Sequence, residues 1–154
     1  FMGKAPVLRI TKQFHFEAAH ALWNYDGLCK NIHGHSYILY VTIKGSPIDE
    51  PMDPKFGMVM DFSQLKKIVN DAIILEMDHS LMVNGNTPHK DMAGASQMFG
   101  RVVALPYQPT CENMIVDFAA RLKALLPKGV SLHALRLHET ATSYAEWLAE
   151  ENEE

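Results

Sequence analysis

An alternation of apolar side chains over residues 36–45 is the strongest constraint on the fold. Tyr37, Leu39, Val41 and Ile43 recur at every second position, a period that is typical of a β-strand. Apolar residues also occur at positions between them, so we expect both faces of this strand to be covered.

Two histidines lie at the entrance to this strand. His33 and His35 are separated by one glycine, so an extended chain points both imidazoles to the same side. A catalytic zinc usually has three protein ligands and an open position, and His20, at the end of an earlier apolar alternation, offers the third. Cys29 is close enough in sequence to be a fourth ligand or a free thiol beside the metal. Each histidine alone also fits a surface or core position, but together they predict a metal site.

Length and composition limit the class of protein. A chain of 154 residues, 47% of them apolar and 21% charged, predicts one globular domain over residues 1–154. No apolar run is long enough to span a bilayer, and no signal-peptide pattern opens the chain. Two cysteines, Cys29 and Cys111, make no disulfide framework and favour a reducing, cytoplasmic setting. A net charge of −4 gives no basic footprint for nucleic acid.

The remaining pattern predicts the order βββαβαββ. We expect β-strands over residues 7–19, 36–45, 57–61, 102–105, 132–140 and 143–148. We expect helices over 63–77, capped by Ser63, and over 111–126, capped by Thr110, with a long loop over 83–100. This order is typical of an α+β domain in which two helices pack on one face of a largely antiparallel sheet.

Three acidic positions are further candidates. Asp78 can orient the adjacent His79 and support proton transfer near neutral pH, although such a dipeptide on its own is far more often an ordinary structural pair. Glu139 lies in an otherwise apolar strand, where a carboxylate needs a partner. It can accept two hydrogen bonds from the amidine-like edge of a heterocycle. Glu112, near a helix start, is favourable on dipole grounds alone.

Six short motifs occur together in one order: Phe16-Glu17-Ala18-Ala19-His20, Cys29-x3-His33-Gly34-His35-Ser36-Tyr37, Gly57-Met58-Val59-Met60-Asp61-Phe62, Met77-Asp78-His79, Pro109-Thr110-Cys111-Glu112-Asn113 and Glu139-Thr140. In this set the chain resembles the 6-pyruvoyl-tetrahydropterin synthase family, which includes the bacterial 6-carboxy-5,6,7,8-tetrahydropterin synthases of queuosine biosynthesis. The resemblance covers about residues 8–148. It implies the tunnelling fold, in which the sheets of several subunits join around a pore, commonly in a homohexamer.

The resemblance also implies roles for individual residues. The zinc ligands would be His20, His33 and His35. Proton transfer would fall to Cys29, with Asp78 and His79 as its relay, and the site would lie between subunits. The pterin ring would be anchored by Glu139, with Thr110 and Glu112 lining the same pocket. The chain departs from the family pattern in Met77, where leucine is usual, and in a longer loop over residues 81–107.

The activity that this resemblance implies is a zinc-dependent lyase reaction. The expected reaction takes 7,8-dihydroneopterin triphosphate and water to 6-carboxytetrahydropterin, acetaldehyde and triphosphate, and the compact spacing from Cys29 to His33 favours it. One alternative is the pyruvoyl synthase, which eliminates triphosphate without losing the two-carbon fragment. Another is a non-catalytic protein whose zinc is structural, held by Cys29 and the three histidines. No glycine-rich phosphate loop is present, so unassigned Lys or Arg side chains would hold the triphosphate.

Overall fold

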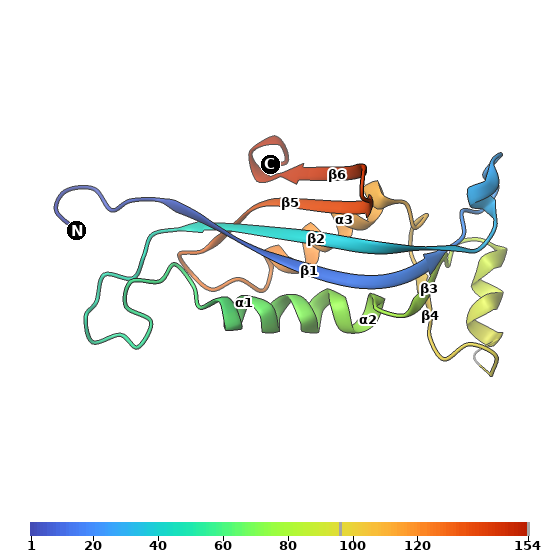
Figure 1. Ribbon diagram of the computed structural model, residues 1–154, viewed down its shortest axis with the longest axis horizontal. Helices are drawn as coiled ribbons and strands as arrows, with labels where there is room; N and C mark the ends of the chain where they lie inside the picture. The colour runs from blue at the N-terminus through green and yellow to red at the C-terminus, as the bar shows by residue number, and fades with distance from the viewer. Residues whose placement is uncertain (96, 154) are drawn as a thin grey trace.

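A six-stranded sheet forms the centre of the computed structural model, which describes residues 1–95 and 97–153. The spatial order of its strands is β4-β3-β1-β2-β5-β6. In chain order the strands are β1 (Leu8–His20), β2 (His33–Gly45), β3 (Ser80–Asn84), β4 (Val102–Leu105), β5 (Ser131–Thr140) and β6 (Ser143–Leu148). The long β1–β2 ribbon runs along the longest axis of the molecule (Figure 1).

Most of the sheet is antiparallel, as the sequence predicts. Neighbouring strands from β1 through β2 and β5 to β6 run antiparallel. The other side of β1 pairs in parallel with β3, and β3 in turn pairs in parallel with β4. The β1–β3 pairing covers only residues 18–20 of β1, so most of that edge of β1 has no strand beside it within the described residues.

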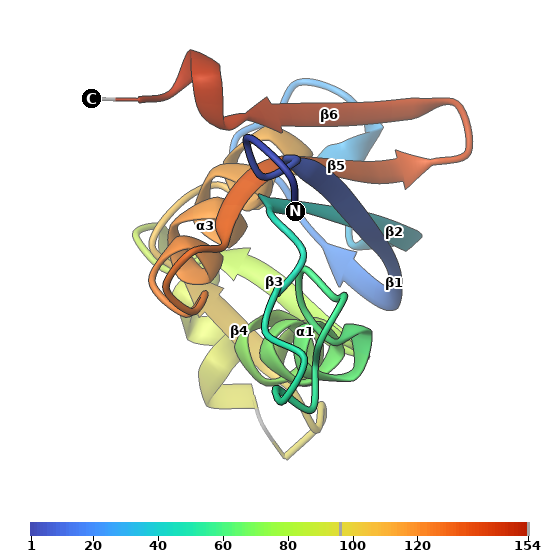
Figure 2. The same ribbon diagram turned by 90° about the vertical axis from the view of Figure 1, so that its left-hand side faces the viewer.

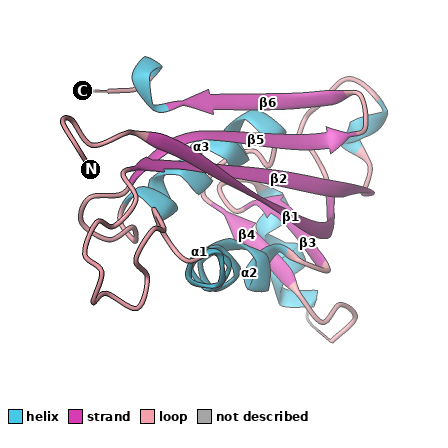
Figure 3. Ribbon diagram, turned by 60° about the vertical axis from the view of Figure 1, so that its left-hand side comes forward, coloured by secondary structure: helices cyan, strands magenta, loops and turns pink. Residues whose placement is uncertain are grey.

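Two helical segments cover one face of the sheet, and the prediction of an α+β fold is confirmed (Figures 2 and 3). The first runs from α1 (Phe62–Val69) through a π-helical turn (Asn70–Ile74) into α2 (Leu75–Met77). The second is α3 (Cys111–Lys123). Short 3-10 helices occupy Leu28–Lys30, Pro88–Ala95 and Ala149–Glu151.

The core lies between this face and the helices. Phe16 of β1 stacks on Tyr37 of β2 with ring centroids 4.8 Å apart, and Phe118 of α3 meets Phe16 edge to face, both favourable aromatic geometries. Leu39, Val41 and Ile43 continue the buried stripe of β2. The residues between them are only half-buried, so the expectation that both faces of β2 are covered is not met within one chain.

The π-helical turn has an identifiable partner. Arg121 of α3 donates to the carbonyl oxygen of Ala72 at 3.0 Å and pairs with Glu76 and Asp117. A π-turn changes the usual helical hydrogen bonding, and the guanidinium supplies a donor to a carbonyl within that turn. The first helical segment is thereby tied to α3.

Several sequence predictions at the ends of elements are wrong. Residues 57–61 form a turn at Gly57 and bends at Val59 and Met60 rather than a strand, because Gly57 has a positive φ of 86° that breaks the extended path. Asp61, not Ser63, caps α1, since its carboxylate accepts from the backbone N–H of Ser63 at 2.8 Å. Thr110 caps α3 as predicted.

The expected loop over residues 83–100 is also corrected. It contains the end of β3 and the 3-10 helix Pro88–Ala95; Ser96 lies outside the described residues. The sequence pattern does not indicate β3, because this strand is a short apolar run directly after a helix. Across the ranges 1–95 and 97–153, no helix combines the length and the apolar character that crossing a membrane requires.

Candidate metal centre and active site

Strand register brings the three predicted histidines together. His20 at the end of β1 is paired with His33 at the start of β2. His35 is paired with Ala18, two residues along the same two strands. These positions share one face of the sheet. One ring nitrogen from each histidine lies within 4.8 Å of the other two, and the ring centroids are 4.5 to 5.1 Å apart.

Backbone carbonyls orient two of these rings. The Nδ1 of His20 lies 2.7 Å from the carbonyl oxygen of Pro109, and the Nδ1 of His33 lies 2.7 Å from that of Asn31. A carbonyl oxygen only accepts, so each Nδ1 carries the hydrogen and each neutral ring leaves a lone pair on Nε2. The two Nε2 atoms are 2.9 Å apart. Facing lone pairs repel unless a cation lies between them, and a carbonyl on the second nitrogen is the usual arrangement around a metal-bound histidine.

A carboxylate completes the surroundings of the histidines. Glu139 lies two residues after the buried Leu137 in β5, at an irregularity in the pairing of β5 with β6. One of its oxygens lies 3.3 Å from the Nε2 of His20 and 3.1 Å from that of His35. The Nε2 of His35 is nevertheless buried without an aligned hydrogen-bond partner in the described part of the chain. That atom fits a metal ligand better than a hydrogen-bond donor.

The cluster places one anion beside the three histidines. Contact with His20 is the largest cause of the lowered pKa of Glu139, and the positive charge that the histidines carry when protonated acts in the same direction. Burial lowers the pKa of His35, partly opposed by Glu139. A neutral histidine is the form that binds metal, so the donor set matches a divalent cation such as zinc.

Cys29 lies outside this cluster. It belongs to the 3-10 helix Leu28–Lys30 and is half-buried with a free thiol. Its carbonyl oxygen accepts from the backbone N–H of Leu22 at 3.1 Å. The group of metal-binding atoms within 4.8 Å of one another contains, among the described residues, only the three histidines. A closed four-ligand site that includes Cys29 is therefore not what this geometry favours.

Asp78 and His79 form a pair at the edge of β1. The Nδ1 of His79 lies 3.0 Å from Asp78, whose other oxygen accepts from the backbone N–H of Glu17 at 2.9 Å. This backbone bond is the main cause of the lowered pKa of Asp78. His79 has a φ of 58°, which is uncommon for a residue with a side chain, and its backbone N–H donates to the carbonyl of Glu17. The turn is thus held by one residue of β1.

His79 borders a cavity that one of the three histidines also lines. This open cavity of about 370 Å³ is lined by His79 together with Glu17, Ser36 and His35. Ser36 donates to Glu17 at 2.7 Å, and strand alternation places both side chains on the face opposite His35. Within one chain, His79 therefore borders the cavity beside His35, but the group of converging metal-binding atoms contains, among the described residues, only the three histidines.

Thr110 and Glu112 lie at the start of α3. The hydroxyl of Thr110 accepts from the backbone N–H of Asn113 at 3.2 Å, so it serves as the helix cap. Glu112 is exposed in the first turn. The adjacent Pro109 carbonyl contacts His20, which puts this segment beside the histidine cluster. Sequence reasoning missed the carbonyls of Asn31 and Pro109, because backbone contacts leave no side-chain signal.

The fold is a curled α+β sheet with a candidate three-histidine metal site at one end. A sequence model of the family described as 6-pyruvoyl tetrahydropterin synthase matches residues 9–150, and the chain belongs to this family.

Named relatives agree with this membership. A 6-carboxy-5,6,7,8-tetrahydropterin synthase of Haemophilus influenzae is 33% identical over 92% of this chain and 99% of its own length. One of Aquifex aeolicus is 31% identical over 92% of this chain and 98% of its own length. A 6-pyruvoyl tetrahydrobiopterin synthase of Pongo abelii is 30% identical over 90% of this chain and 89% of its own length.

Solved structures share the fold. The 6-pyruvoyl tetrahydropterin synthase of Caenorhabditis elegans superposes with a TM-score of 0.68 at 24% identity, over 96% of this chain and 99% of its own. An uncharacterized protein of Wolinella succinogenes gives a TM-score of 0.75 at 18% identity, over 94% of this chain and 99% of its own. The tunnelling fold expected from the motifs is therefore confirmed.

Proposed function

We propose that the protein is a zinc-dependent 6-carboxy-5,6,7,8-tetrahydropterin synthase of queuosine biosynthesis. It converts 7,8-dihydroneopterin triphosphate and water to 6-carboxytetrahydropterin, acetaldehyde and triphosphate. The observation that carries this proposal is the convergence of three histidine ring nitrogens, with two of the rings oriented by backbone carbonyls. The relatives from Haemophilus influenzae and Aquifex aeolicus bear the same activity in their names.

The metal ligands in this proposal are His20, His33 and His35, with one position left open to the substrate. Zinc supplies Lewis-acid chemistry when bound, since it lowers the pKa of coordinated hydroxyls and stabilises developing negative charge. His20 is buried and held by Pro109, so its ring is fixed before any ligand arrives. Such preorganisation favours a tight site.

Proton transfer on the substrate side chain is assigned to Cys29, with Asp78 and His79 as the relay. A thiolate is the reactive form of cysteine, and a nearby imidazolium favours it. Asp78 holds the Nδ1 of His79, which leaves Nε2 to exchange a proton. Because no hydrogen bond joins Cys29 to His79 among the described residues of one chain, the proposal has them meet across a subunit boundary.

Binding of the pterin ring is assigned to Glu139, and Thr110 and Glu112 line the same pocket. A carboxylate accepts two parallel hydrogen bonds from the 2-amino and N3 edge of the ring. Glu139 is only partly exposed and remains ionised because its pKa is lowered. It therefore offers a charged acceptor beside the histidines.

A homohexamer is part of the proposal, with each site between subunits. The support is the half-exposed second face of β2 and the edge of β1, which beyond residues 18–20 has no partner strand among the described residues. Exposed strand edges favour pairing with another chain. We further propose a single-domain, cytoplasmic protein without nucleic-acid or membrane partners.

Product analysis tests the function. Purified zinc-loaded protein is incubated with 7,8-dihydroneopterin triphosphate, and acetaldehyde and triphosphate are quantified, with His33→Ala as the inactive control. Equal amounts of both products are expected. Triphosphate without acetaldehyde would instead support the pyruvoyl synthase, the activity named for the Pongo abelii relative. Neither product, with zinc retained, would support a structural zinc.

A further inference from the structure

We infer that Gln108 is a positioning residue that docks the Cys29-bearing loop onto the segment supporting the metal centre. Its side-chain amide forms two hydrogen bonds with the backbone of Trp23. The Trp23 N–H donates to the Gln108 Oε1 at 3.3 Å, and the Gln108 Nε2 donates to the Trp23 carbonyl at 3.0 Å. The amide thus pairs with the loop as a neighbouring strand would.

The loop has little else to hold it. No residue from 22 to 32 is buried, so packing contributes little to its position. Among residues 1–95 and 97–153, the hydrogen bonds that leave residues 21–32 go only to Gln108 and to the ring of His33. The ring of Trp23 also meets His89 edge to face at 5.0 Å. Trp23 is therefore the attachment point of the loop, and Gln108 is its polar partner.

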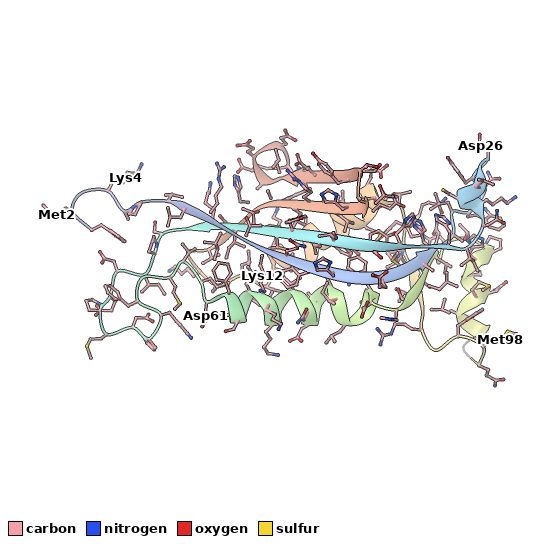
Figure 4. All side chains as sticks on the ribbon, viewed as in Figure 1. Met2, Lys4, Lys12, Asp26, Asp61 and Met98 are labelled. Atoms are coloured by element: carbon pink, nitrogen blue, oxygen red, sulfur yellow. The ribbon has the colours of Figure 1, made fainter. Side chains whose placement is uncertain are left out.

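Cys29 is linked directly to this attachment point. Leu22, next to Trp23, donates its N–H to the carbonyl oxygen of Cys29 at 3.1 Å. This bond closes the loop, so a shift of Trp23 moves Cys29 with it. The position of the thiol consequently depends on whether the Gln108 amide holds Trp23. Figure 4 marks the tip of the same loop with Asp26, at the end of the molecule opposite Lys4.

Gln108 is itself rigidly placed. It precedes Pro109, which confines its backbone to the extended region. Its carbonyl accepts from the N–H of Thr110 at 2.7 Å and from the side chain of Asn113 at 3.0 Å, which fixes it to the start of α3. The carbonyl of Pro109 orients His20. One short segment therefore holds a metal ligand through its backbone and the Cys29 loop through a side chain.

The test compares Gln108→Met, which keeps length but removes both hydrogen bonds, with Gln108→Glu, which keeps only the acceptor for the Trp23 N–H. Iodoacetamide labelling of Cys29 in zinc-loaded protein is followed by peptide mass spectrometry. The net stability contributed by two hydrogen bonds corresponds to a change on the order of 10-fold in the ratio of docked to undocked loop. We expect Cys29 to be labelled about 10-fold faster in Gln108→Met and by an intermediate factor in Gln108→Glu.

Controls separate local release from unfolding. Buried Cys111 should label at an unchanged slow rate, and Gln64→Met, an exposed glutamine of α1, should behave as wild type. Cys29 labelling within twofold of wild type in both Gln108 variants would overturn the inference; if Gln108→Met fails to fold, Gln108→Glu alone decides.

The link to catalysis rests on the proposed function, and a parallel loss of pterin turnover is expected. A wild-type protein without turnover defeats the proposed function, while the labelling rates still decide the role of Gln108.

Discussion

The candidate metal ligands come from two paired strands, whereas the residues proposed for proton transfer come from a loop and a strand edge. His20 and His33 face each other in strand register, and their rings are fixed by carbonyls of the same chain. Cys29 lies in an exposed loop, and the side chain of His79 is 79% exposed. One chain thus brings the candidate metal ligands together, whereas no hydrogen bond joins Cys29 to His79 among its described residues.

The histidines on the strands and the residues on the loop and strand edge therefore depend on different supports. Side chains on rigid strands with supporting hydrogen bonds are held in place without a ligand. Groups on loops and edges have few such supports, and function there requires a partner surface or a clamp. We therefore expect substitutions in the metal centre to act on one chain, and substitutions of Cys29 or His79 to depend on assembly.

The largest effect is expected from His35→Ala. Removing one of three ligands from a preorganised site should reduce zinc content to well below one ion per chain and abolish measurable turnover, because a metal with two protein ligands is weakly held. Metal analysis after dialysis measures the zinc content, and product formation measures the turnover. His138→Ala, a half-buried histidine of β5 outside the cluster, is the matched control. Full zinc occupancy in His35→Ala would contradict the assignment of ligands.

Cys29→Ala and His79→Ala are expected to lower turnover while leaving the metal in place. Loss of a general acid or base commonly lowers the rate by about 10²- to 10⁴-fold. Zinc content and melting temperature should stay near those of wild type, because neither side chain lies in the histidine cluster. A loss of zinc in Cys29→Ala would instead indicate a fourth ligand.

Mixed oligomers sharpen the comparison further. If Cys29 and His79 meet across a boundary, co-assembly of equal amounts of the two inactive variants should restore about a quarter of the wild-type sites, since each residue comes from an intact chain in half of them. Turnover of the mixture is compared with that of each variant alone. Light scattering checks assembly and should give the mass of a hexamer. No recovery in a mixture that assembles would place both residues in one chain.

The strand framework was predictable because alternation repeats over many residues. The pattern of Tyr37, Leu39 and Val41 fixes which face of β2 is buried, and the same period puts His33 and His35 on that face. The third candidate ligand, His20, follows from the same argument on β1. Regular structure carries its own signal, so this part of the site could be predicted.

The rest depends on contacts that the sequence does not display. Gln108 bonds to a backbone 85 residues away, and Pro109 acts through its carbonyl. The short strand Ser80–Asn84 has too few residues for a clear period. Asp61 replaced the expected Ser63 as helix cap because both are good capping residues and only geometry selects between them.

Glu139→Gln should have a smaller effect than loss of Cys29. It tests whether Glu139 binds the pterin ring or the metal. A neutral amide cannot accept two charge-assisted hydrogen bonds from the pterin edge, so KM should rise by about 10- to 100-fold. Zinc affinity, measured by competition with a chelator, should change little. A loss of zinc affinity comparable to that of His35→Ala would make Glu139 a metal ligand, which its 3.1 Å approach to His35 makes worth testing.

The smallest effect is expected from Asp78→Asn on the acid stability of zinc-free protein. The N–H of Glu17 lowers the pKa of Asp78 in the folded state, so its contribution to stability is present above the unfolded pKa of about 3.9. That contribution is lost as the pH falls through the lower folded value. The melting temperature of wild type should therefore fall more steeply below about pH 4 than that of Asp78→Asn, by a few degrees. Asp71→Asn, an exposed carboxylate paired with Lys67, is the control. Parallel curves for Asp78→Asn and wild type would mean that the bond to Glu17 does not hold the His79 turn in solution.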